Sequence, residues 1–245
     1  MNTLDAMDYL KGKKWIDLSH EVHDKIPRFG AFNASREETL FKIKEDGFFA
    51  KELTFPTQYS THIDAPIHFA QGKRYLHELE LKELMLPLYV IHKEELVKEN
   101  HDYCVTVQDI MDFETEFGIL PKEAFVAFAS GWSNRWDSPE KYYNRDEDGN
   151  SHTPGWSLEA LKYLNEVRDV TAIGHETLDT DSAVDFRKNK GLFGEYYWLK
   201  QDKYQVEVMR NLDQVPSVGS VILTSFPNVL NAPGFPVRSF AILPN

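Results

Sequence analysis

Six short runs of β-branched, aromatic and other apolar residues recur along the chain and alternate with segments of helical pattern. They occupy residues 14–18, 88–91, 125–129, 170–173, 221–224 and 237–243. Several runs are apolar at consecutive positions, which is typical of strands that are covered on both faces. With the helical segments between them, these runs predict a fold of the α/β class.

Two helices are indicated by their capping residues. Thr106 precedes apolar residues at helical spacing, Asp109 stands three residues after this cap, and Gly118 ends the pattern. Ser157 precedes a second helical pattern over residues 158–164. Shorter helices are expected at two further places, residues 4–10 and 77–85.

The composition narrows the class of protein. The chain has 245 residues, and no repeat or Ser/Gly-rich linker divides it, so one domain over residues 1–245 is expected. Its net charge of −12, with only one short basic stretch at residues 187–190, argues against a nucleic-acid partner. The single cysteine, Cys104, excludes a disulfide framework. No signal-peptide pattern and no apolar run of membrane-spanning length occur, so no membrane partner and a cytoplasmic location are expected.

The segment most suited to chemistry is residues 57–69, which read TQYSTHIDAPIHF. In an extended chain, side chains alternate between two faces, so Gln58, Ser60, His62, Asp64 and His68 share one face. The apolar residues between them share the other face and anchor the strand in a core. Because Pro66 lies between Asp64 and His68, the position of His68 on this face is less strictly fixed.

Imidazole and carboxylate groups at this spacing can bind one divalent cation. His nitrogens and carboxylate oxygens are ligands for Zn²⁺ or Mn²⁺, and such an ion activates water for attack on a carbonyl. A histidine that does not bind the metal could transfer a proton to a leaving nitrogen. The alternative is a half-exposed edge strand whose polar residues have no catalytic role.

Residues 61–68, THIDAPIH, resemble the core of the signature H-x-G-T-H-x-D-x-P-x-H. This signature marks the cyclase-like metal-dependent hydrolases, which include bacterial kynurenine formamidase and isatin hydrolase. Further similarity lies at residues 16–20, 86–88, 131–133 and 174–212, so the resemblance covers most of the chain. It implies a swivelling β/β/α fold, a small-molecule substrate and assembly as a homodimer or homotetramer.

The resemblance also implies roles for residues of the motif. His62 and Asp64 match metal ligands of the family, and His68 matches its proton donor and acceptor. Two positions depart from the signature. Gln58 replaces the first histidine and is at best a weaker ligand, and Ser60 replaces a glycine, which would strain its backbone if φ is positive.

The family's distal ligands are a histidine and, twelve residues later, a glutamate. The resemblance places Glu195 and Glu207 at these positions, so a carboxylate replaces the second imidazole. This oxygen-rich set shifts the expected metal from Zn²⁺ toward Mn²⁺ or Mg²⁺. One or two ions per chain are compatible with three carboxylates, and one tightly bound ion is favoured.

Two further residues are candidates for contacts with substrate. Phe29 follows residues 26–28 at a position where formamidases have a tryptophan that stacks on substrate, although core packing is the simpler role. His175 follows the predicted strand 170–173, at an end where α/β folds often place a site; a role in a structural turn is the alternative.

These expectations lead to two hypotheses about function. The first is a metal-dependent amidohydrolase, resembling arylformamidase or isatin hydrolase, that cleaves a carbon–nitrogen bond of a small aryl or cyclic amide. The second is a metal- or ligand-binding protein that has this fold but no turnover. A serine hydrolase is excluded because no Gly-x-Ser-x-Gly nucleophile turn occurs. Nucleotide cofactors are disfavoured because no phosphate-binding glycine motif occurs.

Overall fold

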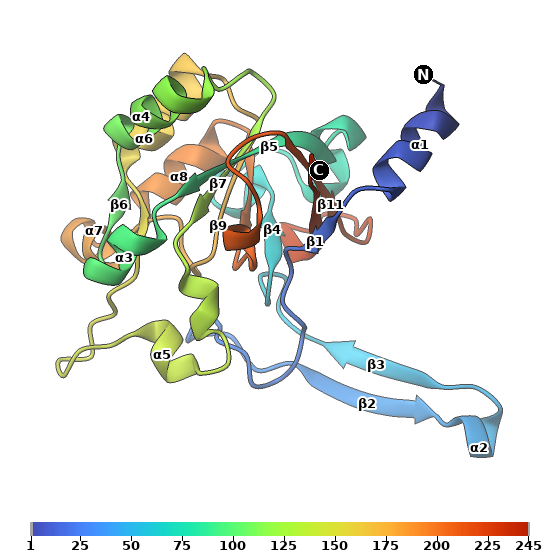
Figure 1. Ribbon diagram of the computed structural model, residues 1–245. Coiled ribbons are helices and arrows are strands. Elements are labelled where there is room, and N and C mark those ends of the chain that lie inside the picture. Colours follow the sequence, from blue (N-terminus) through green and yellow to red (C-terminus); the bar gives the residue numbers. More distant parts are fainter. Residues whose placement is uncertain (1, 245) are drawn as a thin grey trace.

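A curled mixed β-sheet runs through the body of the protein in the computed structural model, which describes residues 2–244 (Figure 1). Within these residues the sheet has nine strands in the order β1-β13-β11-β5-β7-β9-β10-β4-β12. In that order they span Trp15–Asp17, Arg238–Ile242, Ser220–Ser225, Met85–His92, Phe125–Ala129, Ala172–His175, Tyr204–Glu207, His62–Asp64 and Gly234–Pro236. The four central strands β5, β7, β9 and β10 are parallel, and the outer strands pair antiparallel.

Alternation of side chains along the central strands separates two hydrophobic cores. On β7, Phe125 and Ala127 join one core, whereas Val126 and Phe128 join the other. All five residues of β7 are buried, which explains why this strand is apolar at every position. The sheet is therefore covered on both faces, as the consecutive apolar runs predict.

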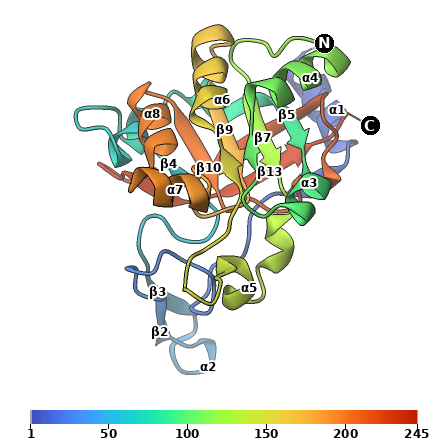
Figure 2. The same cartoon turned by 90° about the vertical axis from the view of Figure 1, so that its left-hand side faces the viewer.

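The helices α3, α4, α6, α7 and α8 lie on the same side of the sheet (Figure 2). They span Glu94–Glu99, Val107–Phe117, Leu158–Lys162, Ala183–Asn189 and Phe193–Lys200. Helix α4 begins and ends as predicted, because Thr106 and Asp109 form a reciprocal capping box and Gly118 follows its last residue. Helix α6 begins after Ser157 and continues as a π-helical turn over Tyr163–Val167.

The remaining helices lie outside this layer. Helix α1 spans Thr3–Lys11 and helix α5 spans Pro139–Tyr143. The prediction of a single helix over residues 77–85 is wrong, because this segment forms two 3₁₀ turns, Leu76–Glu78 and Leu81–Leu84. The carboxylates of Glu78 and Glu83 each accept a hydrogen bond from the backbone N–H three residues earlier, which closes two separate turns in place of one helix.

A hairpin arm projects from the body of the protein (Figure 1). Its strands β2 and β3 span Arg36–Phe41 and Ala50–Thr54, and helix α2, Ile43–Asp46, lies at its tip. All six residues of β2 are exposed, and the two strands form a sheet of their own. A second small sheet joins β6, Cys104–Val105, to β8, Gly155–Trp156.

This arrangement confirms the predicted single-domain α/β fold. Strand β4 brings the histidine-rich segment against β10 near one end of the sheet, while β12 pairs with its other edge. No helix among residues 2–244 is long and apolar enough to cross a membrane.

Candidate metal centre

Strands β4 and β10 bring four polar side chains together. In their antiparallel register His62 is opposite Glu207, and Asp64 is opposite Gln205. The residues between these pairs, Ile63 and Val206, belong to the hydrophobic core. Period-two alternation therefore gathers the polar groups on one face of the strand pair, as the sequence predicts for His62 and Asp64.

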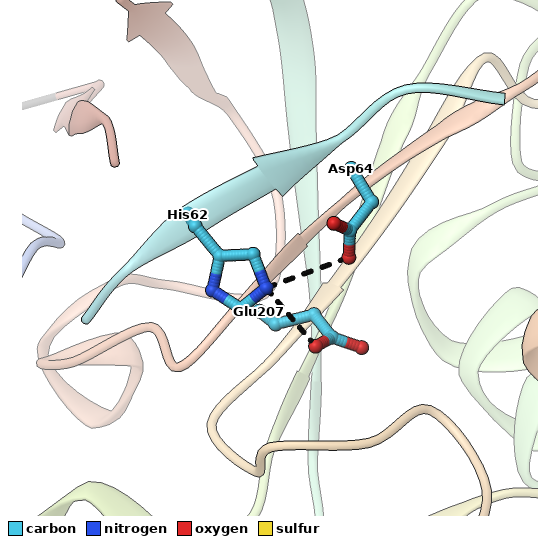
Figure 3. Close-up of side chains that lie close together, drawn as sticks. All are labelled: His62, Asp64 and Glu207. Atoms are coloured by element: carbon cyan, nitrogen blue, oxygen red, sulfur yellow. Dashed lines mark ion pairs between the residues drawn. The ribbon is translucent and has the colours of Figure 1, made fainter. Parts of the chain in front are cut away.

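The first group consists of His62, Asp64 and Glu207, and all three side chains are buried (Figure 3). The Nε2 atom of His62 lies 3.5 Å from Asp64 Oδ2 and 3.4 Å from Glu207 Oε2. On the other side of the ring, His62 Nδ1 lies 2.9 Å from the backbone carbonyl of Ser60. Because a carbonyl only accepts, Nδ1 donates this bond, and Nε2 faces the two carboxylates.

A second group shares Asp64 with the first. Suitable atoms of Asp64, His68 and Glu195 all lie within 4.8 Å of one another. His68 Nε2 lies 3.9 Å from Asp64 Oδ1, and Glu195 projects from the first turn of α8. That turn is held by Asp181, whose carboxylate accepts hydrogen bonds from the backbone N–H groups of Gly194 and Glu195 at 2.8 and 2.9 Å.

The charges of this cluster are not balanced by the protein alone. Burial, followed by repulsion from Glu207 and Asp64, raises the pKa of Glu195 well above its usual value. Asp64 Oδ1 is buried and has no hydrogen-bond partner within residues 2–244. An unpartnered carboxylate oxygen beside imidazole and further carboxylates is the donor set that divalent cations use, so these residues fit a bound metal.

Gln205 is a central residue that the sequence analysis missed. It is fully buried, and its Nε2 lies 3.2 Å from Asp64 Oδ2, 3.2 Å from Glu195 Oε1 and 2.9 Å from Glu207 Oε1. Thr180 donates to its Oε1 at 2.8 Å, which fixes the orientation of the amide. The signal that could have found Gln205 is its spacing of two residues from Glu207 on an extended strand.

Gln58 and His68 lie together at the edge of the cluster. Gln58 Nε2 is 3.4 Å from His68 Nδ1, and its Oε1 accepts a hydrogen bond from Thr57 Oγ1 at 2.5 Å. Ser60 has a φ of 58°, in the left-handed region that favours glycine. Its Oγ donates toward the backbone carbonyls of His20 and Glu21, both at 3.2 Å, and these contacts stabilise the turn.

A cavity of about 370 Å³ lies beside the cluster. Its walls combine polar cluster residues with aromatic and aliphatic side chains: Phe29, Phe32, Gln58, His62, His68, Phe69, Leu178, Asp179, Leu192, Glu195 and Glu207. Phe29 is 57% exposed and packs edge-to-face on Phe32 at this cavity. His175 lies behind Glu207, fully buried, with Nε2 3.2 Å from Glu207 Oε1, and it is not a wall residue.

Comparison with known proteins identifies the family of this chain. The family model described as "Putative cyclase" matches residues 16–182, about two thirds of the chain. The chain belongs to the cyclase family. Among its relatives in this family, an isatin hydrolase of Roseibium aggregatum is 27% identical over 233 residues, which cover 90% of this chain and 86% of that protein. A kynurenine formamidase of Geobacillus thermodenitrificans is 28% identical over 128 residues, which cover 51% of this chain and 56% of that enzyme.

Solved structures of cyclase-family proteins have the same architecture. Isatin hydrolase A from Labrenzia aggregata, bound to benzyl benzoate, superposes with a TM-score of 0.91 at 26% identity and full coverage of both chains. Isatin hydrolase A from Ralstonia solanacearum superposes with the same TM-score at 25% identity, covering 99% of this chain and 98% of that one.

Proposed function

We propose that this protein is a metal-dependent hydrolase that cleaves the carbon–nitrogen bond of a small aryl or cyclic amide within one catalytic domain, residues 1–245. The observation that carries the proposal is the buried group His62, Asp64 and Glu207, whose ligand atoms lie within 4.8 Å of one another beside an aromatic-lined cavity. The similarity to isatin hydrolases and kynurenine formamidases along the chain supports the same chemistry.

His62, Asp64 and Glu207 are the proposed ligands of one tightly bound ion, and Glu195 completes the acidic side of the site. Carboxylates outnumber imidazoles here, which favours Mn²⁺ over Zn²⁺. Because Asp64 also belongs to the second group, Asp64 and Glu195 would hold a second ion if two bind per chain. When bound, a divalent ion would polarise the substrate carbonyl and lower the pKa of a water molecule, so that the water loses a proton more easily and becomes a better nucleophile.

His68 is the proposed proton donor and acceptor, and Gln58 is proposed to orient it. An amide Nε2 only donates, so the contact with His68 Nδ1 leaves the ring proton of neutral His68 on Nε2, the atom that faces Asp64. The side chain of His68 is 26% exposed at the cavity wall, so substrate can reach it. A proton at this atom can be delivered to the leaving nitrogen as the carbon–nitrogen bond breaks.

Phe29 and His175 take different proposed roles. Phe29, with Phe32 and Phe69, offers the aryl part of the substrate an aromatic wall. The sequence analysis expects His175 to bind substrate, but its position behind Glu207 favours a positioning role. Its Nε2 contacts Glu207 Oε1, which leaves Oε2 to face His62.

The test combines metal analysis with turnover. The purified protein is expected to contain about one Mn²⁺ or Zn²⁺ per chain, and Asp64→Ala is expected to lose it. His68→Ala should retain the metal but lose hydrolysis of formanilides, isatin-like rings or lactones. A protein that binds metal but hydrolyses none of these would instead be a binding member of the fold, and absence of metal after incubation with Mn²⁺ and Zn²⁺ would refute the mechanism.

The hairpin arm supports the proposal that the protein forms a homodimer or homotetramer. Six large apolar side chains of the arm are 41–71% exposed: Leu40, Phe41, Ile43, Phe48, Phe49 and Leu53. A two-stranded hairpin is marginally stable alone, so a second copy is the proposed cover for this surface. Because Arg36 pairs with Thr54, a two-residue turn can replace the arm, and light scattering should then show a smaller assembly.

The cytoplasmic location stays a prediction.

A further inference from the structure

A second chamber adjoins the cavity at the metal cluster. It has a volume of about 340 Å³ and shares four wall residues with the first cavity: Phe29, Leu178, Asp179 and Leu192. The shared walls make the two hollows neighbours, so the second chamber lies next to the place where the amide group of a substrate would meet the cluster. Phe186 and Ala183 add to the apolar part of its lining.

Two arginines without carboxylate partners line the second chamber. The guanidinium of Arg28 donates to the backbone carbonyls of Phe32 and Ile26, at 3.1 and 3.4 Å. The guanidinium of Arg145 lies 5.2 Å from the centre of the Tyr143 ring. Neither arginine forms an ion pair with a carboxylate among residues 2–244, and neutral carbonyls or an aromatic face do not cancel a full positive charge.

In this chain with a net charge of −12, six arginines form no ion pair with a carboxylate among residues 2–244, and Arg28 and Arg145 are the two of them that line this chamber. Arg74, Arg168 and Arg238 all form ion pairs, with Glu83, Glu114 and Asp17 respectively. An acidic protein offers many carboxylates, so two unpaired guanidinium groups at one hollow favour an anion that comes from outside the chain.

Tyr143 connects the two arginines structurally. Its hydroxyl accepts a hydrogen bond from the backbone N–H of Arg28 at 2.9 Å and donates to the backbone carbonyl of Arg28 at 2.7 Å. The ring of the same residue lies beneath the guanidinium of Arg145. The loop that contains Arg28 and the segment that contains Arg145, just after helix α5, are thus held against each other at this chamber.

The two chambers carry opposite charge, because Glu195 and Glu207 line the first and the two arginines line the second. Asp179 lines both hollows, near the carboxylates of the cluster, and suits an N–H donor at the junction. The two arginines supply positive charge in the second chamber, which suits a carboxylate. We propose that the second chamber is a subsite for a carboxylate substituent of the substrate, so that the preferred substrates are aryl amides bearing an acidic side chain. This inference rests on the proposed amide hydrolysis.

The test uses a pair of substrates that differ only in charge. One is a formanilide with a propionate side chain on the ring. The other is the same formanilide with a neutral propionamide in place of the propionate. For the wild type we expect kcat/KM to be about tenfold or more higher for the propionate, mainly through a lower KM, because charge-assisted bonds to arginine are strong. Arg145→Gln and Arg28→Gln should each reduce this ratio toward one.

Two controls make the result specific. Arg36→Gln removes a positive charge from the exposed strand β2, which does not line the chamber, and it should keep the ratio. Arg28→Lys retains a positive charge if Arg28→Gln fails to fold, and it should keep part of the preference. A wild type that does not prefer the propionate, or an equal ratio in wild type and Arg145→Gln, would overturn the subsite.

A binding measurement separates this inference from the proposed function. Calorimetry compares 3-phenylpropionate with 3-phenylpropionamide on the metal-loaded protein and on Arg145→Gln. If no formanilide is hydrolysed, the proposed function fails, yet tighter binding of the carboxylate that depends on Arg145 still supports the subsite. Equal binding of both compounds to the wild type contradicts it.

Discussion

Neutralising Glu195 is expected to stabilise the metal-free protein although it weakens metal binding. A carboxylate oxygen of Glu195 lies within 4.8 Å of one of Asp64, and the side chain is 3% exposed. Two full charges at that separation repel by about 3 kcal/mol at an effective dielectric constant of about 20. Burial and this repulsion, together with Glu207, raise the pKa of Glu195, so the metal-free fold takes up a proton instead.

The magnitude follows from proton linkage. The pKa of a free glutamic acid is 4.5, so a protonated Glu195 costs the fold about 1.4 kcal/mol for each pH unit above that value, which sets an upper limit of about 3 kcal/mol at pH 7. Between pH 4.5 and the raised pKa, the folded state binds more protons than the unfolded state, and its stability falls as pH rises. Glu195→Gln removes this cost: the gain should approach about 3 kcal/mol at pH 7 and stay below about 1 kcal/mol at pH 5.

Urea unfolding of chelator-treated protein at pH 5 and pH 7 measures both values. Glu147→Gln, an exposed loop substitution, is the matched control and should change neither. Adding Mn²⁺ should then raise the free energy of unfolding more for the wild type than for Glu195→Gln, because the variant binds the ion less tightly. A gain that is absent at pH 7, or equal at both pH values, would refute the electrostatic reasoning.

Three further predictions concern Gln205, His20 and Cys104. Gln205→Met should weaken Mn²⁺ binding about 10- to 100-fold by calorimetry, because it removes the amide that contacts three carboxylates; unchanged affinity would contradict this role. Burial and the charge of Arg210 lower the pKa of His20 to about 3, so the unfolded state binds more protons and stability falls as pH drops below 6.5. His20→Phe can keep the stacking on Trp136, and urea unfolding at pH 4 should show a free energy of unfolding about 3 kcal/mol higher than for the wild type. If the variant loses stability below pH 6.5 as steeply as the wild type does, His20 is not the cause. Cys104 should react slowly with a disulfide reagent at pH 8 until the protein is unfolded, since burial and Asp185 raise the pKa of its thiol to about 12; fast reaction of the native protein would show otherwise.

The strands and capped helices could be predicted because their signals are local. Strand β7 and helix α4 match the predicted positions, since consecutive burial and a capping box leave a direct trace in the sequence. The hairpin arm could not be predicted in this way. All six residues of β2 are exposed, so no apolar alternation marks the strand, and its pairing with β3 depends on contacts within the arm alone.

The candidate site shows the same division between local and long-range information. Alternation correctly places His62 and Asp64 on one face, because both lie on the short strand β4. It does not extend to Gln58 or His68: Ser60 has a positive φ before the strand, and Pro66–His68 forms a 3₁₀ turn after it. Spacing along β10 could place Gln205 on the same face as Glu207, but its contacts with Asp64 and Glu195 depend on how β10 packs with β4 and α8, which no local pattern contains.

The positions of Gln58 and Gly234 together explain how the departure from the family signature changes the site. A Cβ atom at residue 234 would overlap Gln58 Nε2 and the carbonyl of Ile63, so glycine on β12 makes room for the amide. In that space Thr57 donates to Oε1, and Nε2 is directed at His68. The residue that replaces a family imidazole thus contacts the proposed proton donor, and the proposed metal ligands His62, Asp64 and Glu207 all come from the paired strands β4 and β10. A rigid strand pair fixes the distances among its side chains better than the turn around Ser60 could, so the proposed cation site does not need an imidazole at residue 58.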